Sequence, residues 1–210
     1  MSNTDQLINL LSEQAPPKKQ SAHPMLLLLV WVAGAFAYAA FLASFGLRHD
    51  LFAKLHETLF PAEIFSLSAV MIASCLALIY LAYPDMRQQK FLLAFPVVAL
   101  LVFAAVLGLE YQAMPPETPL PPLTVQCTIC ILFYATLPAV SLLRLLRQQA
   151  TTHPRITGSL IILAANSIGA LALRLHGETD SIPHLITWHY LPMVLASVVG
   201  MVLGRIFLKW

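Results

Sequence analysis

Residues 25–45 read MLLLLVWVAGAFAYAAFLASF and contain no charged side chain. A helix needs about 20 predominantly apolar residues to cross the hydrocarbon core of a bilayer, so this run is long enough to span one. It is also far longer than the apolar region of a signal peptide, which has roughly 7–15 residues. The run therefore predicts a transmembrane helix near the start of the chain.

Five further apolar runs of similar length follow the first. The six predicted spans are Met25–Phe45, Pro61–Tyr83, Phe91–Tyr111, Leu123–Leu146, Ile156–Leu173 and Leu185–Phe207. This pattern predicts an all-α, polytopic membrane protein in which residues 23–210 form a bundle of six transmembrane helices. Residues 1–22 form a separate N-terminal tail.

The composition of the chain agrees with this class. Of its 210 residues, 59% are hydrophobic and 10% are charged, whereas a soluble domain carries about 25% charged residues. So few charges could not cover a water-soluble globule, which excludes a soluble enzyme and a disordered chain. The net charge of +2 gives no basic patch for nucleic acid. We therefore expect the protein to lie in a lipid bilayer and not to bind DNA or RNA directly.

The distribution of lysine and arginine predicts the orientation. With the N-terminus inside, nine of the twelve basic residues fall on the inner side, namely Lys18, Lys19, Arg87, Lys90, Arg144, Arg147, Arg155, Arg205 and Lys209. Only Arg48, Lys54 and Arg174 fall outside. Because cytoplasmic loops carry the excess of Lys and Arg, both termini are predicted to be cytoplasmic.

Prolines and glycines mark special positions within the spans. Pro96, Pro138 and Pro192 are expected to interrupt three helices. Gly200 and Gly204 form a G-x-x-x-G stripe that favours close packing on a neighbouring span of the same chain. No ionisable residue falls in the middle third of any predicted span, which argues against a pump or an ion-coupled transporter.

The N-terminal tail contains a short amphipathic pattern. Residues 4–14 read TDQLINLLSEQ, and Leu7, Leu10 and Leu11 share one helical face with Ile8 at its edge. About ten residues are too few for a stable isolated helix. The segment has no Lys or Arg, so an anionic membrane surface would not attract it. Docking of this face in a groove of a cytoplasmic protein is one interpretation; the other is an unstructured tail with chance spacing.

Cysteines and histidines gather on the predicted outer side. Cys127 and Cys130 lie in the first two turns of the fourth span, and five of the seven histidines lie nearby: His49, His56, His176, His184 and His189. Thiols and imidazoles are ligands of soft and borderline metals, so Cys127, His176, His184 and His189 are candidate metal ligands. Packed core and loop residues, or a pair of thiols open to oxidants, are the alternatives. No resident cofactor is expected, only transient binding of a soft metal.

Cys127 is the expected reactive thiol of this group. The N-terminus of a helix favours the thiolate, and Cys130 lies one turn deeper. Two cysteines at i and i+3 of a helix are poorly placed for an unstrained disulfide. We expect Cys127 to act with a histidine of the outer loops, His176 first among them.

Several motifs together resemble the NrsF-type membrane anti-sigma factors. They are TDQLINLL at 4–11 followed by Pro16-Pro17, GLRHDL at 46–51, Cys127 with Pro138 and Leu146-Arg147 downstream, Leu175-His176 with Asp180-Ser181 and Trp188, and GRIFLKW at 204–210. The resemblance covers nearly the whole chain. One departure stands out, because the family's second cysteine, directly after Leu-His, is replaced here by Gly177.

The resemblance implies a regulatory function without catalysis. The tail, through Leu7, Ile8, Leu10 and Leu11, would hold an extracytoplasmic-function sigma factor at the bacterial inner membrane. Outer-face residues, Cys127 above all, with Cys130 and His176, would sense envelope stress and trigger release. The sequence leaves open whether thiol sensing survives the change at Gly177, and it identifies neither the sigma factor, the signal nor the oligomeric state.

A thiol oxidoreductase that uses Cys127-x-x-Cys130 is the alternative from another class. Such an enzyme needs a second thiol pair to pass electrons on. The one other cysteine, Cys75, is predicted deep in the second span and cannot supply it.

Overall fold

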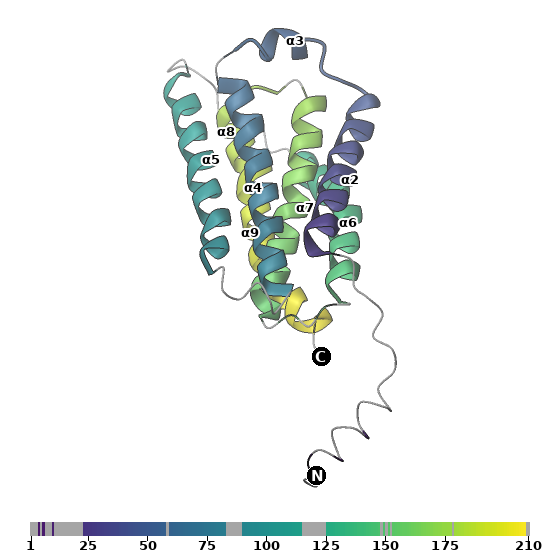
Figure 1. Ribbon diagram of the computed structural model, residues 1–210. Helices are drawn as coiled ribbons and strands as arrows, with labels where there is room; N and C mark the ends of the chain where they lie inside the picture. Colours follow the sequence, from purple (N-terminus) through teal and green to yellow (C-terminus); the bar gives the residue numbers. More distant parts are fainter. Residues whose placement is uncertain are drawn as a thin grey trace.

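The chain folds into a bundle of long helices in the computed structural model, which describes residues 4, 6, 10, 23–57, 59–82, 90–114, 125–147, 149, 151, 153–177 and 179–208 (Figure 1). Every element within these residues is helical. In chain order they are α2 (Pro24–Ser44), α3 (Leu51–Lys54), α4 (Leu59–Ala82), η2 (Lys90–Ala94), α5 (Phe95–Gln112), α6 (Val125–Arg147), α7 (Pro154–His176), α8 (Ile182–Leu185), η3 (Ile186–Tyr190) and α9 (Leu191–Phe207).

Six helices are long and apolar enough to cross a membrane, which confirms the predicted number. Their bounds are Met25–Ser44, Leu59–Ala82, Lys90–Gln112, Val125–Arg147, Pro154–His176 and Ile182–Phe207. The sixth begins earlier than predicted, because α8 and the π-helical stretch η3 continue into α9 without a break. A helix pairs most of its backbone N–H and C=O groups internally, as a membrane interior requires.

The helix α7 lies at the centre of the bundle (Figure 1). It packs against α9, α6, α4 and α2, and it is mostly buried, as is α4. By contrast, α2, α5, α6 and α9 are mostly exposed and carry large apolar side chains on their outer faces, such as Phe36, Phe133 and Val199. This broad apolar surface suits hydrocarbon better than water.

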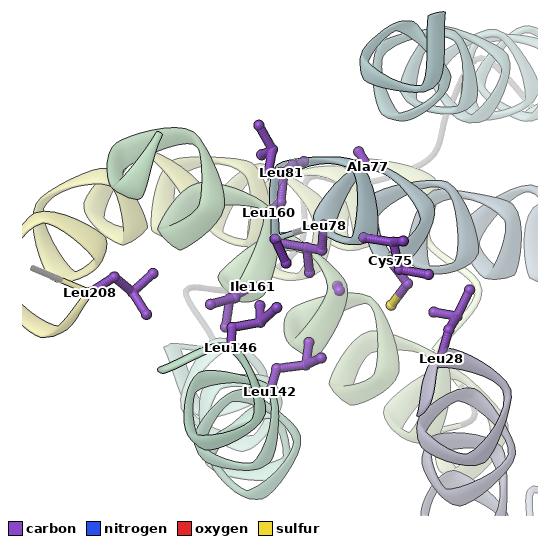
Figure 2. Packing of buried hydrophobic residues seen from close by; sticks show 13 residues of the cluster. Leu28, Cys75, Ala77, Leu78, Leu81, Leu142, Leu146, Leu160, Ile161 and Leu208 are labelled. Carbon is purple, nitrogen blue, oxygen red and sulfur yellow. The ribbon is translucent and has the colours of Figure 1, made fainter. Parts of the chain in front are cut away.

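The largest buried apolar cluster joins four helices (Figure 2). It includes Leu28 of α2, Cys75 of α4, Leu142 of α6 and Ile161 of α7. Cys75 is 1% exposed. It therefore packs as a small apolar residue, far from any role that needs an accessible thiol.

Three glycines bring α7 and α9 into close contact. A Cβ atom added to Gly200 would lie 2.6 Å from the carbonyl oxygen of Gly158, and one added to Gly204 would also meet the backbone of Gly158. Larger residues would force the helices apart. The predicted packing of the G-x-x-x-G stripe within the chain is confirmed.

The prolines take two different places in their helices. Pro138 lies inside α6, as predicted. Pro96 and Pro192 lie in the first turns of α5 and α9, where each helix follows directly on a helical stretch of another type. The 3₁₀ stretch η2 and the π-helical stretch η3 precede them, so the two spans change helix type at these points.

Candidate functional site

Polar residues concentrate at the end of the bundle that carries α3, the upper end in Figure 1. We call it the α3 end. Two groups lie there. The ion-pair network comprises Arg48, Asp50, Lys54, Glu57, Glu63, Arg174 and Asp180. The cysteine–histidine group comprises Cys127, His184 and His189.

A buried ion pair forms the inner part of the network. Glu63, in the first turns of α4, is 0% exposed. The Nε atom of Arg174, in the last turn of α7, donates to both Glu63 carboxylate oxygens at 3.0 Å. The hydroxyl of Tyr190 donates to the same carboxylate. Good geometry and several donors offset the large desolvation cost of burying such a charge.

Asp180 links this pair to the loops outside the bundle. Its carboxylate accepts from Arg174 Nη1 at 2.9 Å, from Arg48 Nη1 and Nη2 at 3.0 Å, and lies 3.1 Å from Lys54 Nζ. Arg48 also donates from Nε and Nη2 to Asp50, at 2.6 and 2.9 Å. These contacts fasten the segment between α2 and α4 to the segment between α7 and α8.

Phe60 supports both arginines of the network. Its ring centroid lies 5.4 Å from Cζ of Arg48 and 4.8 Å from Cζ of Arg174. A guanidinium at this distance from an aromatic face gains a cation–π attraction. The Phe60 ring therefore packs against both guanidinium groups and stabilises their positive charge.

The ion pairs set the pKa values of the groups outside the spans. Burial would raise the pKa of Asp180, but hydrogen bonds from Arg48, Arg174 and Lys54 outweigh it and hold this pKa well below its usual range. The hydrogen bond from Arg48 likewise lowers the pKa of Asp50, and the bond to Asp50 raises the pKa of Arg48. Arg48, Asp50 and Asp180 therefore stay charged at neutral pH.

The sequence reasoning did not identify this network as a unit. Arg48, Asp50 and Asp180 belong to motifs that carry the family resemblance, but the sequence predicted no function for them. The Glu63–Arg174 pair was not predicted. One signal was available: Glu63 and Arg174 both lie within an α-helical turn or so of the outer end of a predicted span, on the same side, with opposite charge.

The cysteine–histidine group draws its members from three elements. Cys127 lies in the first turn of α6, His184 in α8 and His189 in η3. One potential ligand atom from each residue lies within 4.8 Å of the other two. His184 and His189 are 5% and 4% exposed, and their ring centroids are 5.4 Å apart.

Two local features position these residues. Oγ1 of Thr128, next to Cys127, donates to the carbonyl oxygen of Trp188 at 2.6 Å and so ties the start of α6 to η3. In η3 the backbone is π-helical over Ile186–Tyr190. Adjacent residues of a helix point in different directions, and here His189 belongs to the cysteine–histidine group whereas Tyr190 donates to Glu63.

The other predicted sensor residues lie elsewhere. His176 packs against Gly46, where an added Cβ would come within 2.6 Å of its ring, and it is not part of the cysteine–histidine group. Cys130 is half-buried one turn further along α6, and all three cysteines of the chain are free thiols. The sequence reasoning thus named all three members of the group, together with His176.

Most of the predicted partner-binding segment lies outside the described residues. Leu7, Ile8 and Leu11 cannot be placed for this reason. Thr4, Gln6 and Leu10 are described, each in helical conformation and exposed. Leu10 is 55% exposed.

Comparison with known proteins gives one family. The sequence model of NrsF, described as negative regulator of sigma F, matches residues 11–210. The chain is 26% identical over 211 residues to the "Probable anti-sigma-F factor NrsF" of Azospira oryzae, a match that covers 99% of each chain. No solved structure matches the chain.

Proposed function

The chain belongs to the NrsF family of negative regulators of sigma F, and on this premise we propose that it is an integral membrane anti-sigma factor. It holds an extracytoplasmic-function sigma factor through its N-terminal tail and releases it when envelope stress is sensed at the α3 end. Family membership is the observation that carries the proposal. The protein acts by binding and not by catalysis.

The shape of the bundle supports a membrane setting with two distinct faces. Six helices are long and apolar enough to span a bilayer. The ion-pair network and the cysteine–histidine group lie at the α3 end, whereas α2 begins and α9 ends at the opposite end (Figure 1). The charge bias of the sequence assigns that opposite end to the cytoplasm. Sensing and sigma-factor binding would then occur on opposite sides of the bilayer.

Fusions of alkaline phosphatase test this topology. The enzyme is active only outside the cytoplasm, so a fusion after Gln112 should be active. Fusions after Gln149 and after Trp210 should be inactive. Activity of the Trp210 fusion would contradict an even number of spans, and inactivity of the Gln112 fusion would reverse the orientation.

The exposed side chain of Leu10 supports the tail as the binding element. Leu10 is helical and 55% exposed, which leaves it available for a groove on another protein. The sequence spacing predicts that Leu7, Leu10 and Leu11 share one helical face, and a helix of about ten residues is too short to persist alone. The tail would therefore fold on binding.

Charged substitutions in the tail test this binding. Leu10→Asp with Leu11→Asp should remove about 2–4 kcal/mol of binding free energy, which is a loss of about 30-fold or more in affinity. Transcripts of the sigma factor's targets should rise, while the amount of this protein in the membrane stays constant. The matched control is Asn9→Asp with Ser12→Asp, which adds the same charge on the opposite face and should repress normally. Full repression by the leucine variant would show that the tail is not the binding element.

Cys127 is the proposed sensor residue. It lies in the first turn of a span, with His184 and His189 as its close neighbours. Cys127→Ser should reduce the induction ratio for a soft metal or an oxidant, and Cys130→Ser should not. Maleimide should label Cys127 of intact cells faster than Cys130. Normal induction of the Cys127 variant would mean that the signal enters elsewhere.

A further inference from the structure

The cysteine–histidine group has nearly the dimensions of a metal site. The ligand atoms of Cys127, His184 and His189 lie within 4.8 Å of one another. A tetrahedral Zn²⁺ with bonds of about 2.0–2.3 Å holds its ligand atoms roughly 3.5 Å apart. Contraction by about 1 Å, through side-chain rotation and a small shift of η3 toward α6, would therefore bring the three ligand atoms to the spacing that one ion requires.

The burial of His189 independently points to a ligand. The residue is 4% exposed, and neither Nδ1 nor Nε2 has a hydrogen-bond partner among the described residues. Leaving a buried polar atom unsatisfied costs about 1–3 kcal/mol, and such atoms are rare in folded proteins. A metal ion on one nitrogen would remove much of this cost.

The kinds of ligand select the kind of metal. One thiolate and two imidazoles suit Zn²⁺ and Cu⁺, whereas Mg²⁺ and Ca²⁺ require oxygen ligands. Within the described residues the group contains no carboxylate. Glu63, a carboxylate at the same end of the bundle, is already bound by Arg174 and Tyr190.

We propose that Cys127, His184 and His189 bind one thiophilic d¹⁰ metal ion, Zn²⁺ or Cu⁺, as a three-ligand site. The Cys127 thiol loses its proton to solvent when the metal binds, so binding weakens as the pH falls. The fourth position of a tetrahedral ion stays open for water or an external ligand. This site does not depend on the proposed anti-sigma function, because it is defined by metal binding alone.

Metal binding would also change the shape of the α3 end. The site joins the start of α6 to α8 and η3, which are distant in sequence. The hydrogen bond from Thr128 to Trp188 already brings these elements together. Contraction of the ligands would draw η3 toward α6 and act on α9, which continues directly from η3 to the opposite end of the bundle (Figure 1).

Cobalt provides a spectroscopic test in the full-length chain. The protein is purified in detergent, stripped with a chelator and titrated with Co²⁺. We expect about one ion per chain, with a thiolate-to-cobalt charge-transfer band and the intense visible bands of tetrahedral coordination. Zn²⁺ added to one sample and Cu⁺ to another should displace the cobalt, and the order of displacement identifies the preferred metal.

Variants decide whether these three residues are the ligands. Cys127→Ser should abolish the charge-transfer band. His189→Asn should weaken Co²⁺ binding at least about tenfold, because even mutation of a residue that only hydrogen-bonds to a metal ligand costs about that much affinity. The matched controls Cys130→Ser and His176→Asn should bind as the wild type does. Thermal unfolding of the metal-free variants checks that each one folds. If His189→Asn does not fold, the result for Cys127→Ser decides the outcome. A cobalt spectrum without a thiolate band, or one that Cys130→Ser removes, would overturn the proposal.

Discussion

Glu63 and His189 are both buried polar residues at the α3 end, and they differ in what surrounds them. Glu63 is 0% exposed and accepts hydrogen bonds from Arg174 and Tyr190. His189 is 4% exposed, and the described residues offer neither ring nitrogen a hydrogen-bond partner. The two groups even meet in the chain, since Tyr190, which binds Glu63, directly follows His189.

This difference separates a structural element from a site that awaits a ligand. The ion-pair network is satisfied, so its role is to hold the loops of the α3 end in one arrangement. In the cysteine–histidine group, neither ring nitrogen of His189 has a hydrogen-bond partner among the described residues, so the surrounding packing holds this side chain when no ligand is bound. Removal of one partner should therefore damage the network far more than the cysteine–histidine group.

The largest effect is expected from Arg174→Met. This change leaves the Glu63 carboxylate buried without its cation, and breaking a buried pair in this way costs about 3–5 kcal/mol. Thermal unfolding of the purified protein in detergent measures the loss.

A double variant is the control for this prediction. Glu63→Gln combined with Arg174→Met removes both charges and should recover most of the lost stability, because no uncompensated charge remains. If the stability losses of the two single substitutions simply add in the double variant, Glu63 and Arg174 are not energetically coupled. The contrast between Glu63 and His189 would then be wrong.

A smaller effect is expected at the partly exposed rim of the network, from Asp180→Asn. The folded pKa of Asp180 is lowered, since bonds from Arg48, Arg174 and Lys54 outweigh its burial. Its stabilising effect is therefore fully present above the unfolded pKa of about 3.9 and is lost as the pH falls further. At pH 7 the variant should be less stable by about 1–2 kcal/mol, a value reduced for solvent screening.

The pH dependence distinguishes this mechanism from a general loss of packing. Unfolding curves of the wild type and Asp180→Asn should approach one another as the pH falls from about 5 toward 3. A gap that stays constant over this range would mean that the charge of Asp180 is not what stabilises the loops.

The fold was largely predictable from the sequence, because membrane spans depend on one-dimensional hydropathy. Six runs predicted six long helices, and Gly200 with Gly204 predicted a close helix contact that the structure places on Gly158. The start of the sixth span was less predictable. Polar residues such as His184 and His189 interrupt the apolar run there, yet the chain remains helical through η3 because these side chains are buried among other helices.

The candidate site was predictable in its members but not in their grouping. Thiol and imidazole ligands could be named from residue type, whereas the separation of Cys127 from His189 is set by the packing of α6 on η3. Helix rotation likewise decides that His176 turns toward Gly46. Periodicity along a single chain does not fix rotations between helices, so His176 could not be told apart from His184 in advance.

The smallest effect is expected from His189→Leu in metal-free protein, the counterpart of Arg174→Met. A leucine of similar volume removes two unsatisfied nitrogens from a buried place, so stability should change by no more than about 1 kcal/mol in either direction. Addition of Zn²⁺ should then raise the unfolding temperature of the wild type but not of the variant, because an ion that binds only the folded state stabilises it. Cys130→Ser serves as the control and should respond to Zn²⁺ as the wild type does. A large loss of stability in metal-free His189→Leu would show that the imidazole has a structural partner, and the distinction between the two groups at the α3 end would not hold.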